Sequence, residues 1–107
     1  MELDTRLSKM GVGENALDMN LHLRGIDPND TRRIVAIARL TVELIEISRQ
    51  EKNLYTHNRV RGIGQELDKL GGMAAMQGVW YTIQPVVGAS KSSEIETCWN
   101  GIGNWLR

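Results

Sequence analysis

One segment, residues 31–50, constrains the fold of this chain most, because its apolar side chains recur at α-helical spacing over about five turns. They cover most of the helix circumference and leave one narrow polar stripe. A helix of this kind is buried among other helices. The segment therefore predicts an all-α fold, a small antiparallel helical bundle with residues 31–50 as its buried central helix. The apolar residues are Ile34, Val35, Ile37, Ala38, Leu40, Val42, Leu44, Ile45 and Ile47, and the polar stripe consists of Arg32, Arg39, Glu43, Glu46 and Gln50.

Two more main helices are predicted after the central one. The first runs from about Asn53, with apolar residues three or four positions apart, and stops at the pair Gly71 and Gly72. The second starts at Met73 and is bent or stopped near its end by Pro85, whose ring removes one backbone hydrogen bond. Short connections of this kind favour antiparallel neighbours.

A fourth main helix is predicted near the C-terminal end. Residues 88–92 are expected to form a connecting loop, and Ser93 with Glu96 resembles a capping box that starts a helix. We expect Glu94 on the solvent-facing side of this helix. The opposite, apolar face is formed by Ile95, Cys98, Trp99, Ile102 and Trp105.

Two interpretations compete for residues 15–24. Apolar and polar residues alternate there, which is typical of a half-buried strand, and such a strand would need the same segment of a second subunit as its partner. However, the segment contains no β-branched or aromatic residue, and Asn15 with Asp18 resembles a helix N-cap with an acidic third residue. We therefore favour a helix. Before it, residues 1–12 are expected to form a short, loosely held helical segment.

The length and the net charge of the chain limit the kinds of protein that it can be. A chain of 107 residues is expected to form one helical domain, residues 1–107, with one core. Its 13 basic and 13 acidic side chains cancel, so it lacks the positive field by which nucleic-acid-binding proteins attract phosphates. The charge is uneven, because residues 1–30 are acidic and residues 31–69 are basic. These two regions could face each other within one chain or across a dimer.

The sequence predicts a cytoplasmic protein without a membrane partner. The first ten residues contain no apolar signal core, and no run of eighteen apolar residues occurs. Cys98 is the only cysteine, which excludes a disulfide within the chain and agrees with a reducing compartment. We expect this thiol to be packed and inert.

No motif predicts catalysis, a cofactor or a metal site. The chain has two histidines and no Glu-x-x-His pair, so a carboxylate-bridged metal site in the bundle is not expected. An enzyme would require His57 beside a carboxylate such as Glu46 or Glu66, and nothing in the spacing selects either pair. The polar stripe of residues 31–50 is instead expected to carry surface ion pairs, such as Arg39 with Glu43.

A basic patch is the sequence's best support for nucleic-acid binding, a hypothesis that we disfavour. The two helices joined at residues 71 and 72 have the turn composition of a helix-turn-helix. The second helix would read the bases, yet it has no Lys or Arg between residues 73 and 84. The candidate phosphate contacts are Arg32, Arg33, Arg59 and Arg61.

The aromatic residues suggest a candidate ligand site. All three tryptophans lie between residues 80 and 105, and the chain has no phenylalanine. A pocket between the last two helices, lined by Met76, Trp80, Tyr81 and Trp99, could bind a small molecule. The alternative, favoured by the spacing, is that these side chains form an aromatic core.

Residues 58–76, NRVRGIGQELDKLGGMAAM, resemble one helix-turn-helix unit of HEAT-type helical repeats. Together with residues 99–105, WNGIGNW, this segment also resembles short uncharacterised bacterial segments. The HEAT resemblance implies protein binding on a helical surface, although a solenoid needs several stacked units and this chain has at most one.

These observations favour a protein that acts by association. We expect a non-enzymatic protein that binds itself as a homodimer, or binds another protein, through part of its Trp-rich or N-terminal apolar surface. The reason is that the chain has more apolar helix faces than one core of this size easily accommodates.

Overall fold

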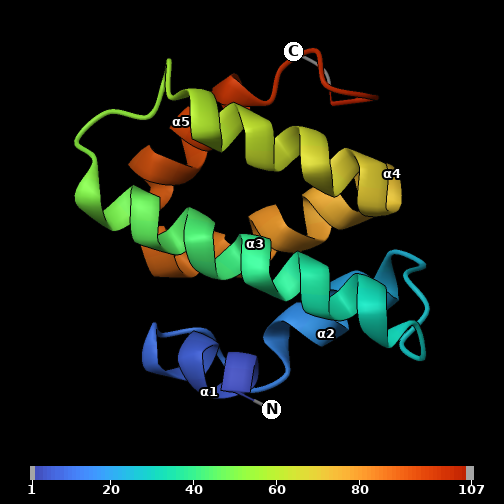
Figure 1. Cartoon of the computed structure of the whole chain (residues 1–107). Helices are drawn as coiled ribbons and strands as arrows, with labels where there is room; N and C mark the ends of the chain where they lie inside the picture. The colour runs from blue at the N-terminus through green and yellow to red at the C-terminus, as the bar shows by residue number, and fades with distance from the viewer. Residues whose placement is uncertain (1, 106–107) are drawn as a thin grey trace.

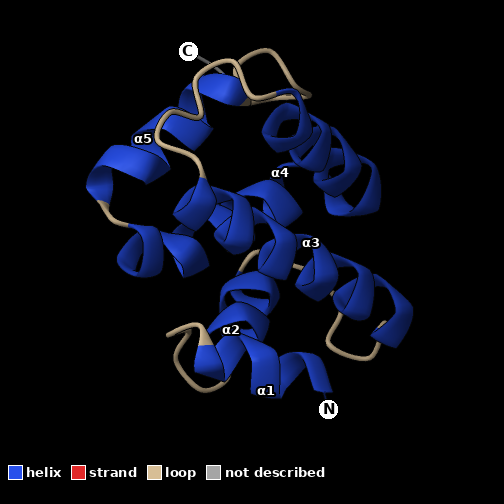
Figure 2. Cartoon of the chain, turned by 60° about the vertical axis from the view of Figure 1, so that its left-hand side comes forward, coloured by secondary structure: helices blue, strands red, loops and turns tan. Residues whose placement is uncertain are grey.

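The computed structural model describes residues 2–105, and over this range the chain is all-α (Figure 1). Five α-helices follow one another along the described chain, and Figure 2 shows that loops alone connect them. The predicted fold class is therefore confirmed. The helices are α1 (Glu2–Lys9), α2 (Ala16–Leu23), α3 (Thr31–Gln50), α4 (Asn58–Val87) and α5 (Ala89–Cys98).

Helix α3 is the buried centre of the bundle, as its apolar pattern predicts. It starts at Thr31 and is capped by Asp30, whose side chain accepts a hydrogen bond from the backbone N–H of Arg33 at 3.2 Å. Ile37, Leu44 and Ile45 have no exposed surface. Helices α1 and α4 both pack against α3, and Figure 1 shows α1 and α4 on its opposite sides.

Within residues 15–24, Ala16–Leu23 form helix α2, so the strand interpretation is wrong. Leu17 and Leu21 point into the core from α2, and Met19 and Leu23 remain exposed. The proposed cap differs from prediction, because Asn15 adopts a left-handed conformation with φ 60° and its side chain makes no capping hydrogen bond. Burial of one apolar edge, rather than a cap, holds this short helix against α4.

Helix α4 consists of two arms, residues 58–70 and residues 73–87, that meet at the predicted glycine pair. Gly72 has φ 61° and ψ −147°, a combination that residues with a Cβ rarely adopt. A Cβ on Gly71 would lie 2.7 Å from Ile26 Cδ1, so a side chain there would displace its neighbour. The N-terminal arm begins at Asn58 instead of about Asn53, because His57 Nδ1 accepts the Val60 N–H and caps the helix there.

The start of the last helix was predicted wrongly. Gly88, at φ 91°, changes the chain direction within one residue, so α5 begins at Ala89 and no loop spans residues 88–92. Ser93 and Glu96 consequently lie inside α5 and form no capping box. The helix also ends early, at Cys98, and the buried Ile102 and Trp105 reach the core from turns.

Glu94 is buried, contrary to its predicted position on the solvent side. Its side chain is 8% exposed, and Oε1 accepts the backbone N–H of Leu54 at 2.7 Å. Cys98, one turn further along α5, donates its thiol to the carbonyl oxygen of the same residue, and Lys91 donates to the carbonyl of Glu51. Both backbone groups of the fully buried Leu54 are thus satisfied by α5, which holds the loop between α3 and α4 in place.

The two glycines inside the N-terminal arm of α4 have different roles. A Cβ on Gly64 would lie 2.5 Å from Trp99 Cδ1, and the Trp99 ring has no room to move because it is fully buried. Its indole N–H also donates to the carbonyl of Val60 at 2.9 Å. A Cβ on Gly62 would meet only the Arg59 guanidinium, at an ordinary 3.8 Å. Of these two positions, only 64 therefore requires glycine for close packing.

These glycines give a matched pair of substitutions. Gly64→Ala should destabilise the protein by about 1–3 kcal/mol, because the added methyl group overpacks the core. Gly62→Ala should stabilise it by up to about 1 kcal/mol, because alanine has the higher helix propensity. Urea unfolding measures both, and equal effects of the two substitutions would contradict the packing described here.

The Glu94 contact gives a second pair. Glu94→Ala leaves the buried Leu54 N–H without an acceptor and should cost about 1–3 kcal/mol of unfolding free energy. Glu94→Gln keeps an acceptor oxygen and should cost distinctly less. Thermal unfolding of the two variants tests this, and equal losses would show that the hydrogen bond to Leu54 is unimportant for stability.

Candidate functional site

A groove of about 500 Å³ runs between α3 and the N-terminal arm of α4. Its floor is apolar, and its rim carries charged side chains from both helices. We call it the α3–α4 groove. It is lined by Ala36, Arg39, Leu40, Glu43, Arg59, Glu66, Lys69 and Leu70.

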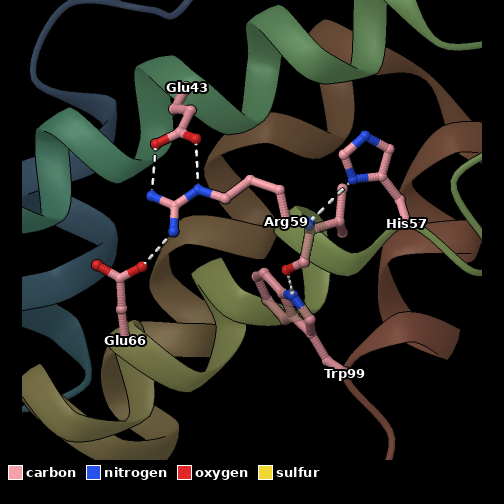
Figure 3. Close-up of polar contacts among 6 residues, drawn as sticks. Glu43, His57, Arg59, Glu66 and Trp99 are labelled. Carbon is pink, nitrogen blue, oxygen red and sulfur yellow. Dashed lines mark hydrogen bonds and ion pairs between the residues drawn. The ribbon is translucent and has the colours of Figure 1, made fainter.

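An arginine between two carboxylates occupies one end of the groove (Figure 3). Arg59 donates from Nε and a terminal nitrogen to the two oxygens of Glu43, at 2.5 and 2.7 Å. Its other terminal nitrogen lies 2.5 Å from Glu66 Oε2. The bidentate bond orients the guanidinium across the two helices. The expected pair of Arg39 with Glu43 is therefore replaced, because Glu43 faces an arginine from the neighbouring helix.

These contacts shift the ionisation of both partners. The hydrogen bond from Arg59 lowers the pKa of Glu43, and burial opposes it more weakly. The same bond raises the pKa of Arg59 above its usual range. All three side chains are between 38% and 47% exposed, so solvent screens their attraction.

The other end of the groove carries cations without partners. Within residues 2–105, neither Arg39 nor Lys69 makes a hydrogen bond or ion pair, and both are exposed. The apolar floor beneath them is formed by Ala36, Leu40 and Leu70. The sequence alone does not predict this combination of an apolar floor and free charge, because it depends on which arm of α4 lies beside α3.

The four candidate nucleic-acid residues do not act as one free basic patch. Arg59 is neutralised by two carboxylates, and Arg33 pairs with Asp30 at 3.2 Å. Arg61 donates to the backbone carbonyls of Cys98 and Asn100. Arg32 is exposed, but it lies eleven residues before Glu43, or roughly 16 Å along α3 from the end where Arg59 binds.

The candidate aromatic site is tightly packed. Met76 and Trp99 have no exposed surface, Trp80 is half-buried, and Tyr81 is 48% exposed. The ring of Trp105 lies 5.2 Å from that of Trp99 and 6.4 Å from that of Trp80. The α3–α4 groove and two smaller cavities beside α2 are lined by other residues.

The indole nitrogens of this aromatic cluster are already used. Trp80, Trp99 and Trp105 donate to the carbonyls of Ser92, Val60 and Glu96, respectively, at 2.9 to 3.1 Å. A ligand would have to displace these backbone bonds. The arrangement agrees with an aromatic core, and the ligand pocket proposed from sequence stays a prediction.

Among the described residues, neither Glu46 nor Glu66 forms a hydrogen bond with His57, because each carboxylate bonds to an arginine. His57 Nδ1 caps α4, whereas Glu46 bonds to Arg6 at 3.0 Å and Glu66 bonds to Arg59. Burial raises the pKa of the Cys98 thiol, and the backbone N–H of His57 opposes this shift. Along residues 2–105, no three His, Cys, Asp or Glu side chains gather as a metal site would require.

A second cavity, of about 300 Å³, lies between α1, α2 and α3. Its wall includes Asp4, Glu14 and Asp18 beside apolar side chains such as Leu7 and Leu17. Burial, and to a smaller degree the charge of Asp4, raises the pKa of Asp18. The acidic N-terminal region therefore faces partly inward and does not lie across the basic groove.

No family model, curated protein or solved structure matches this chain. The resemblance of residues 58–76 to a HEAT-type unit accordingly stays a prediction. Those residues do form two helical segments joined at Gly71 and Gly72. Along residues 2–105, no helix combines the length and apolar character needed to cross a bilayer.

The lowered pKa of Glu43 predicts a pH-dependent contribution to stability. Because the folded-state pKa lies below the usual 4.5, the contribution is complete above about pH 4.5 and is lost as the pH falls through the folded-state value. At this exposure we expect about 0.2–1 kcal/mol. Arg59→Gln should remove it, so the wild type and the variant should differ near pH 7 and converge near pH 3.

Urea unfolding at the two pH values measures this difference. Arg39→Gln is the matched control, because it removes a groove cation that bonds to neither carboxylate. An unchanged gap between wild type and Arg59→Gln at both pH values would contradict an origin in Glu43.

Proposed function

We propose that this chain is a non-enzymatic bacterial protein of the cytoplasm that works by self-association as a homodimer. The cytoplasmic part of the proposal is supported by the single cysteine, Cys98. The part concerning self-association is supported by one surface feature of α2.

The carrying observation is the exposure of two large apolar side chains on one side of α2. Met19 is 60% exposed and Leu23 is 75% exposed. They are four residues apart and therefore lie on the same helix face. Since most other large apolar side chains of residues 2–105 are buried, the expected excess of apolar surface is concentrated here.

The neighbouring side chains extend this surface and hold it rigid. The Arg24 guanidinium lies 4.7 Å from the ring centre of Tyr81, which is 48% exposed on α4. Asn20 donates to Thr82 Oγ1 at 2.9 Å and joins the two helices. We call Met19, Leu23, Arg24 and Tyr81 the α2 patch.

A twofold arrangement suits this patch. If α2 of two copies packs antiparallel, Met19 of one copy meets Leu23 of the other, and the contact occurs twice. The Trp-rich region offers less for this purpose, because Trp99 and Trp105 are buried within their own chain. An eight-residue helix and a few neighbours bury less than a standard interface, so we expect a weak dimer.

Analytical ultracentrifugation from about 10 μM to about 1 mM tests the proposal. The wild type should show a concentration-dependent dimer, and Leu23→Asp should be monomeric because it places a charge in the apolar contact. Tyr55→Asp is the matched control, since Tyr55 is 49% exposed in the loop between α3 and α4. Its self-association should be that of the wild type.

Both substitutions fall on exposed side chains, so the melting temperature should change little. A wild-type protein that stays monomeric over the whole concentration range would overturn the proposal. Dimers that persist in Leu23→Asp would place the interface outside the α2 patch.

A further inference from the structure

We propose that the α3–α4 groove binds a small amphipathic monoanion, with an aliphatic body and one carboxylate. The proposal is independent of self-association, because the groove and the α2 patch share no residue. It follows from the free cations at the rim, the apolar floor and the size of the groove.

The charges of the groove select an anion. Three cations, Arg39, Arg59 and Lys69, face two carboxylates, Glu43 and Glu66, which leaves one net positive charge. Arg59 already bonds to both carboxylates. The uncompensated charge therefore lies with Arg39 and Lys69, at the end of the groove away from Arg59.

The single net positive charge of the groove favours an anion with one negative charge over an anion with two. A carboxylate carries a single negative charge at neutral pH, whereas a phosphate monoester carries about 1.5 to 2. Arg59 and its two carboxylates, Glu43 and Glu66, together carry one net negative charge, which would repel a second negative charge on the ligand. A monocarboxylate thus complements the groove better than a phosphate ester.

The floor accounts for the apolar part of the ligand. Ala36, Leu40 and Leu70 lie beneath the charged rim, so an aliphatic chain could cover them while its carboxylate reaches Arg39 and Lys69. A fully polar anion would gain nothing from this floor. Both parts of the ligand are therefore needed for binding.

The size of the groove favours a small molecule over a protein segment. Its volume of about 500 Å³ lies within the usual range for ligand sites. Eight lining residues are few beside the roughly 20–30 residues that one side of a protein interface contributes. Because a small ligand makes few contacts here, we expect a dissociation constant in roughly the millimolar range.

Hexanoate is a suitable probe, titrated into the full chain and followed by the backbone amide signals in ¹H–¹⁵N NMR spectra. Saturable shifts should centre on Ala36, Arg39, Lys69 and Leu70. Acetate has the charge without the aliphatic body, and 1-hexanol has the body without the charge. Each should bind at least about fivefold more weakly than hexanoate, since each loses one of the two contributions.

The matched control uses a third cation of α3. Arg32 also lies on the polar stripe and is exposed, but it does not line the groove. The double variant Arg39→Gln/Lys69→Gln should weaken hexanoate binding at least about fivefold, whereas Arg32→Gln should leave it unchanged. Ala36→Leu keeps all charges and should also weaken binding, because the larger side chain fills the floor.

Several results would overturn the proposal. They are shifts that do not saturate, shifts centred on Met19 and Leu23 in the α2 patch, and equal binding of acetate. Wild-type affinity in the double variant, or an equal loss in Arg32→Gln, would show that Arg39 and Lys69 do not hold the carboxylate.

Discussion

The structure depends on the burial of α3 on most of its circumference. Twenty residues of helix present their apolar side chains to neighbours on two sides, so α1 and α4 cover opposite faces of α3. Glu43 and Glu46, on the remaining polar stripe, are partly buried by the neighbouring helices. Their carboxylates are reached from both sides, Glu43 by Arg59 of α4 and Glu46 by Arg6 of α1.

The α3–α4 groove is a consequence of this arrangement. At one end of the groove, Arg59 reaches from α4 to Glu43 of α3 and joins the two helices (Figure 3). Toward the start of α3, the small Ala36 faces the end of the N-terminal arm and leaves an open apolar floor. The free cations there stand beside apolar surface, where an anion with an apolar body gains from both. The α2 patch has a different origin, because α2 packs mainly against α4 and its side with Met19 and Leu23 stays exposed.

In the C-terminal half, the buried polar side chains form hydrogen bonds mainly with backbone groups and not with other side chains. Each tryptophan donates to a carbonyl, and Glu94 accepts from the N–H of Leu54. An unsatisfied buried donor would cost more than a surface ion pair contributes. The need to satisfy the Trp99 indole N–H explains why position 64 is a glycine. Only a glycine lets the Trp99 ring approach α4 closely enough to donate to the carbonyl of Val60.

The sequence by itself determined the helical class, the extent of α3 and the break at Gly71 and Gly72. These features follow from local periodicity and from backbone conformations that glycine alone tolerates. Local rules failed where distant residues meet. Ser93 and Glu96 have the spacing of a capping box, yet a single turn at Gly88 places both within α5. Glu94 has the polarity of a surface residue, yet Leu54, forty positions earlier, needs its oxygen.

The candidate site could not be predicted from the sequence either, because it also depends on contacts between residues that are distant along the chain. Arg59 was recognised as a cation, but its two carboxylates, the free state of Arg39 and Lys69, and the apolar floor between them arise only when α4 packs against α3. Periodicity states which face of each helix is apolar. It does not state which faces meet, and the packed structure alone decides which charges are paired and which remain free.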